Sequence, residues 1–134
     1  MRKLSTIFKK FIGQNAVTQT KKVFESLNCH TDDEYQAKEF LNSMYSQGRF
    51  VRAIEGIVNR EDIIVNDEYC LFPEPDLNEP IAHFEGVKFV AFDSELVISE
   101  AACSTIIDQA CANYLRLHPE DTGEINAILQ KRLF

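Results

Sequence analysis

The spacing of apolar residues changes once along this chain, after Arg60, and this change limits the possible folds more than any other feature of the sequence. Before Arg60, apolar residues recur at intervals of three and four, which is the period of an amphipathic helix. After Arg60, short β-branched and aromatic runs are separated by polar turns, as in strands. A helical first half followed by consecutive strands predicts an α+β fold.

The first 60 residues are predicted to be mostly helical. Residues 4–12 form a basic amphipathic stripe, and residues 17–27 carry a second stripe at helical spacing. A third helix follows, and residues 50–58 keep the same period. These segments would pack their apolar sides on whatever the second half of the chain forms.

Three helix starts carry recognisable capping signals. Thr31 can accept a hydrogen bond from a first-turn amide while Glu34 reaches back, as in a capping box. Ser99 is a favourable cap, and Glu100 complements the helix dipole in the first turn. Pro119 is well placed to open a last helix. The third helix should therefore begin near Thr31, and two helices should follow the strands.

The middle of the chain predicts an antiparallel sheet with one long connection. Three prolines within residues 73–80 remove donors that a sheet needs, so this acidic stretch is predicted to be an exposed loop. Asp93 and Ser94 are predicted to turn the chain in the last hairpin. The four strands are predicted at residues 63–65, 69–72, 87–92 and 95–98.

We therefore expect an α+β domain that spans residues 1–134. Residues 1–60 would be mostly helical, residues 61–98 would form the antiparallel sheet, and residues 99–133 would form two helices, with the helices packed on one face of the sheet. A chain of this length can bury about two-thirds of the surface that its unfolded form exposes. Its hydrophobic fraction of 45% and charged fraction of 26% are ordinary for a globular protein.

Charge is distributed unevenly along the chain. The formal net charge is −7, yet residues 1–22 contain six Lys or Arg and no carboxylate. The rest of the chain then holds eight basic and 21 acidic groups, a balance of −13. Residues 61–85 alone contain eight acidic residues and no Lys or Arg. Such a field repels nucleic acid and favours a basic protein as partner.

The acidic segment, residues 61–85, also includes apolar side chains that could anchor a partner. An interface combines such anchors, here Tyr69, Phe72 and Leu77, with a surrounding charge field that steers association. The alternative is that these charges only maintain solubility. The predicted partner-binding residues are Glu61, Asp62, Asp67, Glu68, Tyr69, Glu74, Asp76, Glu79 and Glu85.

The motifs of common enzymes and metal proteins are absent from the sequence. The five glycines are dispersed, which disfavours a phosphate-binding loop, and no C-x-x-C or H-E-x-x-H occurs. The four cysteines are scattered and are interpreted as reduced thiols of a cytoplasmic protein. No cleavable signal or membrane span is recognised. We expect no cofactor, no metal and no catalysis, although an enzyme with an unrecognised site stays an alternative.

Residues 84–130 carry a family resemblance. Phe84-Glu-Gly-Val-Lys-Phe89 leads into a hairpin, Val97-Ile-Ser-Glu100 follows, and a helix ends with Ala110-Cys111-x-x-Tyr114-Leu-x-Leu-His-Pro-Glu-Asp121, before Ile125 and Leu129. This pattern resembles immunity proteins of bacterial contact-dependent growth inhibition systems that act on ribonuclease toxins. The resemblance implies a cytoplasmic protein that is not an enzyme and that binds one cognate toxin domain, blocking its active site or substrate access. It transfers no binding residue to this chain.

A second function from another class is open at this point. The basic amphipathic stripe at residues 4–12 could dock a small adaptor protein on an anionic membrane or an acidic partner. We favour packing of its apolar residues on the domain, because this is the common role of an amphipathic helix. On balance we predict a protein that neutralises a basic toxin and binds neither nucleic acid nor membrane; its oligomeric state is left open.

Overall fold

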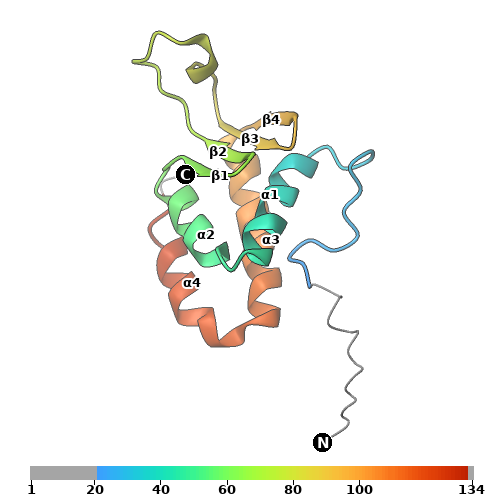
Figure 1. Ribbon diagram of the computed structural model, residues 1–134. Coiled ribbons are helices and arrows are strands. Elements are labelled where there is room, and N and C mark those ends of the chain that lie inside the picture. The colour runs from blue at the N-terminus through green and yellow to red at the C-terminus, as the bar shows by residue number, and fades with distance from the viewer. Residues whose placement is uncertain (1–20, 133–134) are drawn as a thin grey trace, which may run out of the picture.

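The computed structural model describes residues 21–132, which form an α+β fold as predicted (Figure 1). The predicted helix at residues 4–12 lies outside the described residues. Two short 3-10 turns, Pro80–Ala82 and Pro119–Asp121, accompany the main elements. These elements are α1 (Tyr35–Ser46), α2 (Phe50–Val58), β1 (Ile63–Val65), β2 (Glu68–Leu71), β3 (Val87–Ala91), β4 (Ser94–Ile98), α3 (Glu100–Leu117) and α4 (Thr122–Leu129).

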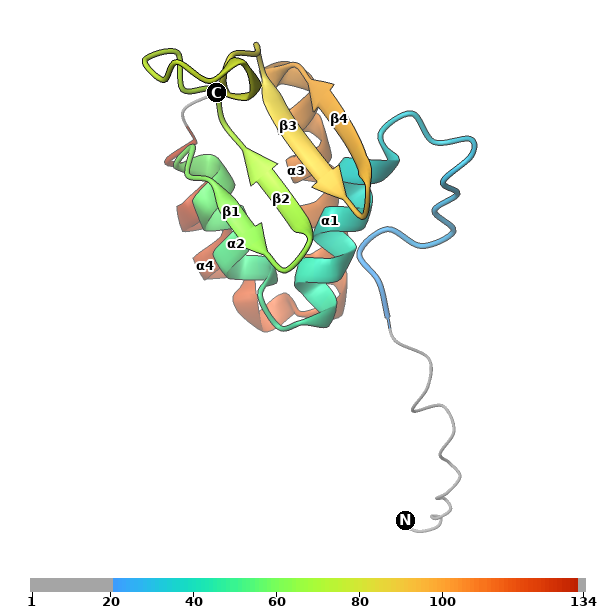
Figure 2. The same cartoon turned by 45° about the horizontal axis from the view of Figure 1, so that its top comes forward.

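The four strands form one antiparallel sheet in the order β1-β2-β3-β4, so strands that follow one another in sequence are neighbours. Figure 2 shows the helices behind this sheet, on one of its faces, as the sequence predicted. The β1–β2 and β3–β4 turns lie at one end of the sheet. The long β2–β3 connection lies at the other end and extends beyond the helices (Figure 1).

Side chains that alternate along the strands build the core between the sheet and the helices. Phe89 of β3 and Phe40 of α1 are both fully buried, and their rings meet edge to face with centroids 5.7 Å apart. Cys70 and Val87 lie on the same side of the sheet as Phe89 and are also fully buried. The period-two pattern that predicted these strands therefore places one set of side chains against the helices.

An aromatic cluster joins the helices away from the sheet. Tyr114 of α3 stacks between Phe50 of α2, at a centroid distance of 4.5 Å, and His118, at 4.8 Å. The Tyr114 hydroxyl donates to Asp121 at 2.5 Å, and burial, followed by this carboxylate, raises the pKa of Tyr114. Tyr45 of α1 hydrogen-bonds to His118 Nε2 at 2.8 Å. The cluster thus fixes four helical segments to one another.

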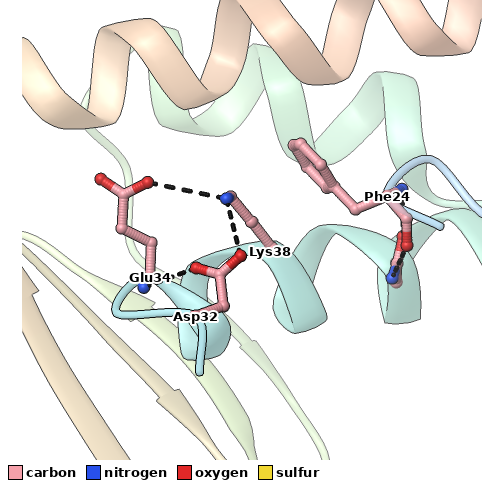
Figure 3. Close-up of polar contacts among 5 residues, drawn as sticks. Phe24, Asp32, Glu34 and Lys38 are labelled. Carbon is pink, nitrogen blue, oxygen red and sulfur yellow. Dashed lines mark hydrogen bonds and ion pairs between the residues drawn. The ribbon is translucent and has the colours of Figure 1, made fainter. Parts of the chain in front are cut away.

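The helix predicted at residues 17–27 is wrong over its described part, because residues 21–34 form turns and bends. Backbone groups there bond to side chains of other elements in place of a helical ladder. Asn42 of α1 is buried, accepts from the Phe24 amide at 2.8 Å and donates to the Phe24 carbonyl at 3.0 Å (Figure 3). Asn113 donates to the Val23 carbonyl at 2.8 Å. Ser26, with φ of 59°, is also incompatible with a helix.

The capping box predicted at Thr31 does not form, because α1 begins at Tyr35. Asp32 takes the local role: its carboxylate accepts from the Glu34 amide at 2.8 Å and pairs with Lys38 at 2.9 Å (Figure 3). The hydrogen bond from Lys38 is the main cause that lowers the pKa of Asp32, against a smaller opposing effect of burial. Asp32, and not the preceding Thr31, therefore accepts the backbone amide hydrogen bond just before α1.

The second half of the chain follows its predictions closely. The Ser99 hydroxyl accepts from the Ala102 amide at 3.0 Å, as expected of a cap, and Glu100 lies in the first turn of α3. Pro119 opens a 3-10 turn, and α4 begins three residues later. The hairpin turn falls on Phe92 and Asp93, one residue earlier than predicted, because Phe92 adopts a positive φ of 52°.

Candidate protein interface

One face of the sheet carries no helix from residues 21–132 (Figure 2). The strand register places Ile64, Tyr69, Val90 and Glu95 in one row across this face, and Leu71, Lys88 and Val97 in the next. We call these seven residues the open face. Ile64 is 66% exposed and Val97 is 42% exposed, whereas Tyr69, Leu71 and Val90 are half-buried. Five of the seven are therefore apolar or aromatic, although no helix of the described chain covers this face.

The long connection at the end of the sheet, residues 73–86, is the acidic loop. Lys88 holds it against the open face, because its ammonium donates to the Ile81 carbonyl at 3.2 Å and lies 4.7 Å from the centroid of the Phe84 ring. The Glu74 amide donates to the Ala82 carbonyl at 2.9 Å and closes the loop on itself. Leu77 and Ile81 remain exposed on it.

Gly86 fixes where the acidic loop returns to the sheet. Its φ is +103°, and a Cβ at this position would lie 2.0 Å from the carbonyl oxygen of Ile98. Only glycine permits both this conformation and this close approach to the end of β4. The base of the loop is thus determined by backbone contact, while its acidic tip is exposed.

Carboxylates lie at both ends of the open face. Asp67 and Asp93 occupy the two tight turns at one end. The acidic loop and the residues leading into β1 occupy the other end, with exposed Glu61, Asp62, Glu74, Asp76, Glu79 and Glu85. Lys88 is the sole Lys or Arg of residues 61–98, and it is buried and bonded as described above. The field over this face is therefore negative.

The structure brings most of the predicted binding residues to this surface. Tyr69 lies in the middle of the open face, between Ile64 and Val90 of the neighbouring strands. Asp62 is exposed, and one of its oxygens accepts from the Phe72 amide at 2.8 Å. The remaining acidic residues are exposed around the face and on its loop, namely Glu61, Asp67, Glu74, Asp76, Glu79 and Glu85.

Glu68 is the exception, because it points to the helices. Side chains alternate along β2, so an outward Tyr69 requires an inward Glu68. Glu68 is 8% exposed, and one oxygen accepts from the Ser43 hydroxyl of α1 at 2.5 Å, whereas Oε2 finds no hydrogen-bond partner in the described part of the chain. Burial raises the pKa of the neighbouring Glu39, an effect that Lys22 opposes and the Glu68 charge reinforces. Glu68 is thus a buried charge of the core and lies outside this surface.

The anchor residues also differ from the prediction. Phe72 is buried, with the Arg60 guanidinium 5.8 Å from its ring centroid, so it belongs to the core. Sequence reasoning missed Ile64, Val97 and the exposed Phe92 of the β3–β4 turn. A signal for them existed, because runs such as Ile63-Ile64-Val65 are apolar at every position, as in strands that are covered on both faces.

The described residues offer little for catalysis or metal binding. Within residues 21–132 no group of three His, Cys, Asp or Glu is arranged to hold a metal ion. Burial raises the pKa of Cys103 and of Cys111 to about 12 and that of Cys70 well above its usual value, so these thiols stay protonated and packed in the core. None of the helices in this part of the chain combines the length and apolar character needed to cross a membrane.

Comparison with known protein families agrees with the resemblance seen in the second half and extends it. A family model described as CDI immunity protein, where CDI stands for contact-dependent growth inhibition, matches residues 33–129. The match includes α1 and α2, which the resemblance at residues 84–130 did not cover, together with the open face and the acidic loop. No curated protein matches the chain. Because the match covers well over half of the sequence, the chain belongs to the family of immunity proteins of contact-dependent growth inhibition systems.

Proposed function

We propose that this protein neutralises one cognate, basic ribonuclease toxin domain in the cytoplasm, without catalysis, by occupying the surface on which the toxin binds RNA. The observation that carries this proposal is the negative field around the open face. Enzymes that grip a polyanion do so with Lys and Arg, so an acidic protein surface can take the place of the substrate. Residues 74–81 of the acidic loop are all exposed, and the loop extends away from the helices (Figure 1).

The charges would act mainly on association. Carboxylates that stay solvated at the rim of an interface raise the association rate and make it dependent on salt. Removing one partner of a charge pair that is fully buried in the interface, by contrast, costs about 2–5 kcal/mol of binding free energy. The exposed carboxylates of the acidic loop have no ion pair within the described chain, so they are available to Lys and Arg of a toxin.

The test is a panel of basic ribonuclease toxin domains from contact-dependent growth inhibition systems, each purified and mixed with this protein. We expect one domain to bind tightly, with an affinity that falls as salt rises, and to lose RNA cleavage when bound. The variant Glu74→Gln/Glu79→Gln should bind it more slowly and with a weaker dependence on salt.

The matched control is Glu25→Gln/Glu124→Gln, which removes the same number of exposed carboxylates from the segment before α1, where it lies beside α3, and from α4. It should leave association unchanged. If both double variants slowed association equally, net charge alone would explain the effect, and the assignment of the acidic loop would fall. If the toxin domain bound by this protein were one that does not cleave RNA, the ribonuclease part of the proposal would be wrong.

A further inference from the structure

We propose that the open face, with Tyr69 at its centre, is the docking surface that sets the lifetime of the complex, and that it receives an apolar anchor of the toxin domain ringed by Lys or Arg. This inference rests on the proposed function and identifies the part of the surface that slows dissociation of the toxin. The acidic loop and the turn carboxylates would then govern encounter.

The first argument is the chemistry of the face itself. Antiparallel sheets with one solvated face alternate between apolar and polar residues, but here the solvent side presents Ile64, Tyr69 and Val90 in a single row. In the next row, Leu71 extends the apolar surface along β2, and Val97 lies across the buried Lys88 from it. Apolar residues with a charged border are the usual composition of a protein interface.

The second argument is the position of Tyr69. Its ring is half-buried between residues of β1 and β3, and the structure of residues 21–132 gives its hydroxyl no hydrogen bond. Tyrosine is one of the residues that most often contribute large binding energies, because a rigid apolar ring and a polar end occur together. Tyr69 can therefore pack against an anchor and also bond to the partner.

The third argument is charge, and it decides between a toxin and a second copy of this chain. Pairing two open faces about a twofold axis would bring the acidic border of one copy onto that of the other. Lys88 cannot relieve this repulsion, since it is buried and its ammonium is bonded to the Ile81 carbonyl. Like charges facing each other across an interface are costly, whereas a basic partner satisfies both borders.

The experiment measures association and dissociation rates of the captured ribonuclease domain at two salt concentrations. The variant Ile64→Ser/Val97→Ser changes the two most exposed apolar residues of the face, so the fold should be retained. We expect dissociation to accelerate by about tenfold or more, with association and its salt dependence unchanged. Tyr69→Phe retains the ring and should accelerate dissociation less than Tyr69→Ala.

Val51→Ser, which alters a half-buried residue of α2 on the helical side, is the matched control and should leave both rates unchanged. Thermal unfolding of every variant separates loss of binding from loss of fold. Unchanged dissociation in Ile64→Ser/Val97→Ser would overturn this inference and leave the proposed function intact. A dimer of the wild-type chain that the same substitutions dissociate, seen by light scattering, would show that a second copy covers the face. If no ribonuclease domain bound even the wild-type protein, the proposed function itself would fail.

Discussion

Replacing Ser43 by alanine is expected to destabilise the protein, because it removes the one hydrogen bond that the described structure gives the Glu68 carboxylate. Glu68 is only 8% exposed, so water can compensate little for the lost donor. Removing one partner from a buried charged acceptor costs about 1.5–3 kcal/mol. For a domain of this size, that corresponds to a fall in melting temperature of about 5–10 °C.

Removing the charge as well should have the opposite effect. Glu68→Met replaces a buried carboxylate, whose Oε2 has no hydrogen-bond partner within residues 21–132, by an apolar side chain of similar volume, and this change is expected to be neutral or stabilising. It also removes the charge that reinforces the raised pKa of Glu39. In the Glu68→Met background, Ser43→Ala should cost less than about 0.5 kcal/mol, because its partner is gone.

Urea unfolding at pH 7, followed by circular dichroism, gives the free energy of unfolding of the wild type, both single variants and the double variant. The reasoning would be refuted if Glu68→Met were less stable than Ser43→Ala, since the carboxylate would then contribute more than its burial costs. The toxin affinity of Glu68→Gln should equal that of the wild type, because Glu68 lies outside the open face.

Three further predictions concern the loop base, the thiols and the N-terminal stretch. Gly86→Ala should lower the free energy of unfolding by about 2 kcal/mol or more, because a Cβ would meet the Ile98 carbonyl and φ is positive; chemical denaturation measures it. At pH 8, iodoacetamide should modify Cys29 quickly and the three buried thiols only after unfolding. Burial raises the pKa of Cys103 and of Cys111 to about 12 in the folded protein, whereas both ionise near pH 9 when unfolded. The free energy of unfolding should therefore fall as the pH rises from about 9 to 12. Asn42→Ala should cost about 2–4 kcal/mol and increase hydrogen exchange at the Phe24 amide, whereas unchanged exchange there would contradict the role of Asn42.

Local patterns predicted the second half of this fold well, because there the local and tertiary preferences agree. Ser99 caps α3 through its own hydroxyl, and the alternation around Phe89 describes a strand that the helices bury. The helix predicted at residues 17–27 was wrong over its described part for the opposite reason. The backbone bonds of Phe24 are made with Asn42, 18 residues away, and periodicity carries no information about such partners.

The candidate interface was predictable in its charge and not in its geometry. Composition identified the acidic stretch, yet assigning Glu68 to the surface required knowing which face of β2 the helices cover. A shift of one residue exchanges the two faces of a strand, so Glu68 and Tyr69 exchange roles with the register. Ile64 and Val97 escaped attention because an apolar strand residue is ordinarily assigned to the core.

The sequential strand order has a consequence for how such a protein can change its specificity. Since β2 and β3 are direct neighbours, the acidic loop only joins two strand ends that already lie side by side, and Gly86 fixes the point of return. The free energy of closing a loop depends only weakly on its length, so insertions, deletions and new residues in this segment need not disturb the sheet or the helices. Under the proposed function, the binding surface can therefore change while the scaffold stays the same, so that two members of the family can carry different loops and each retain a folded protein.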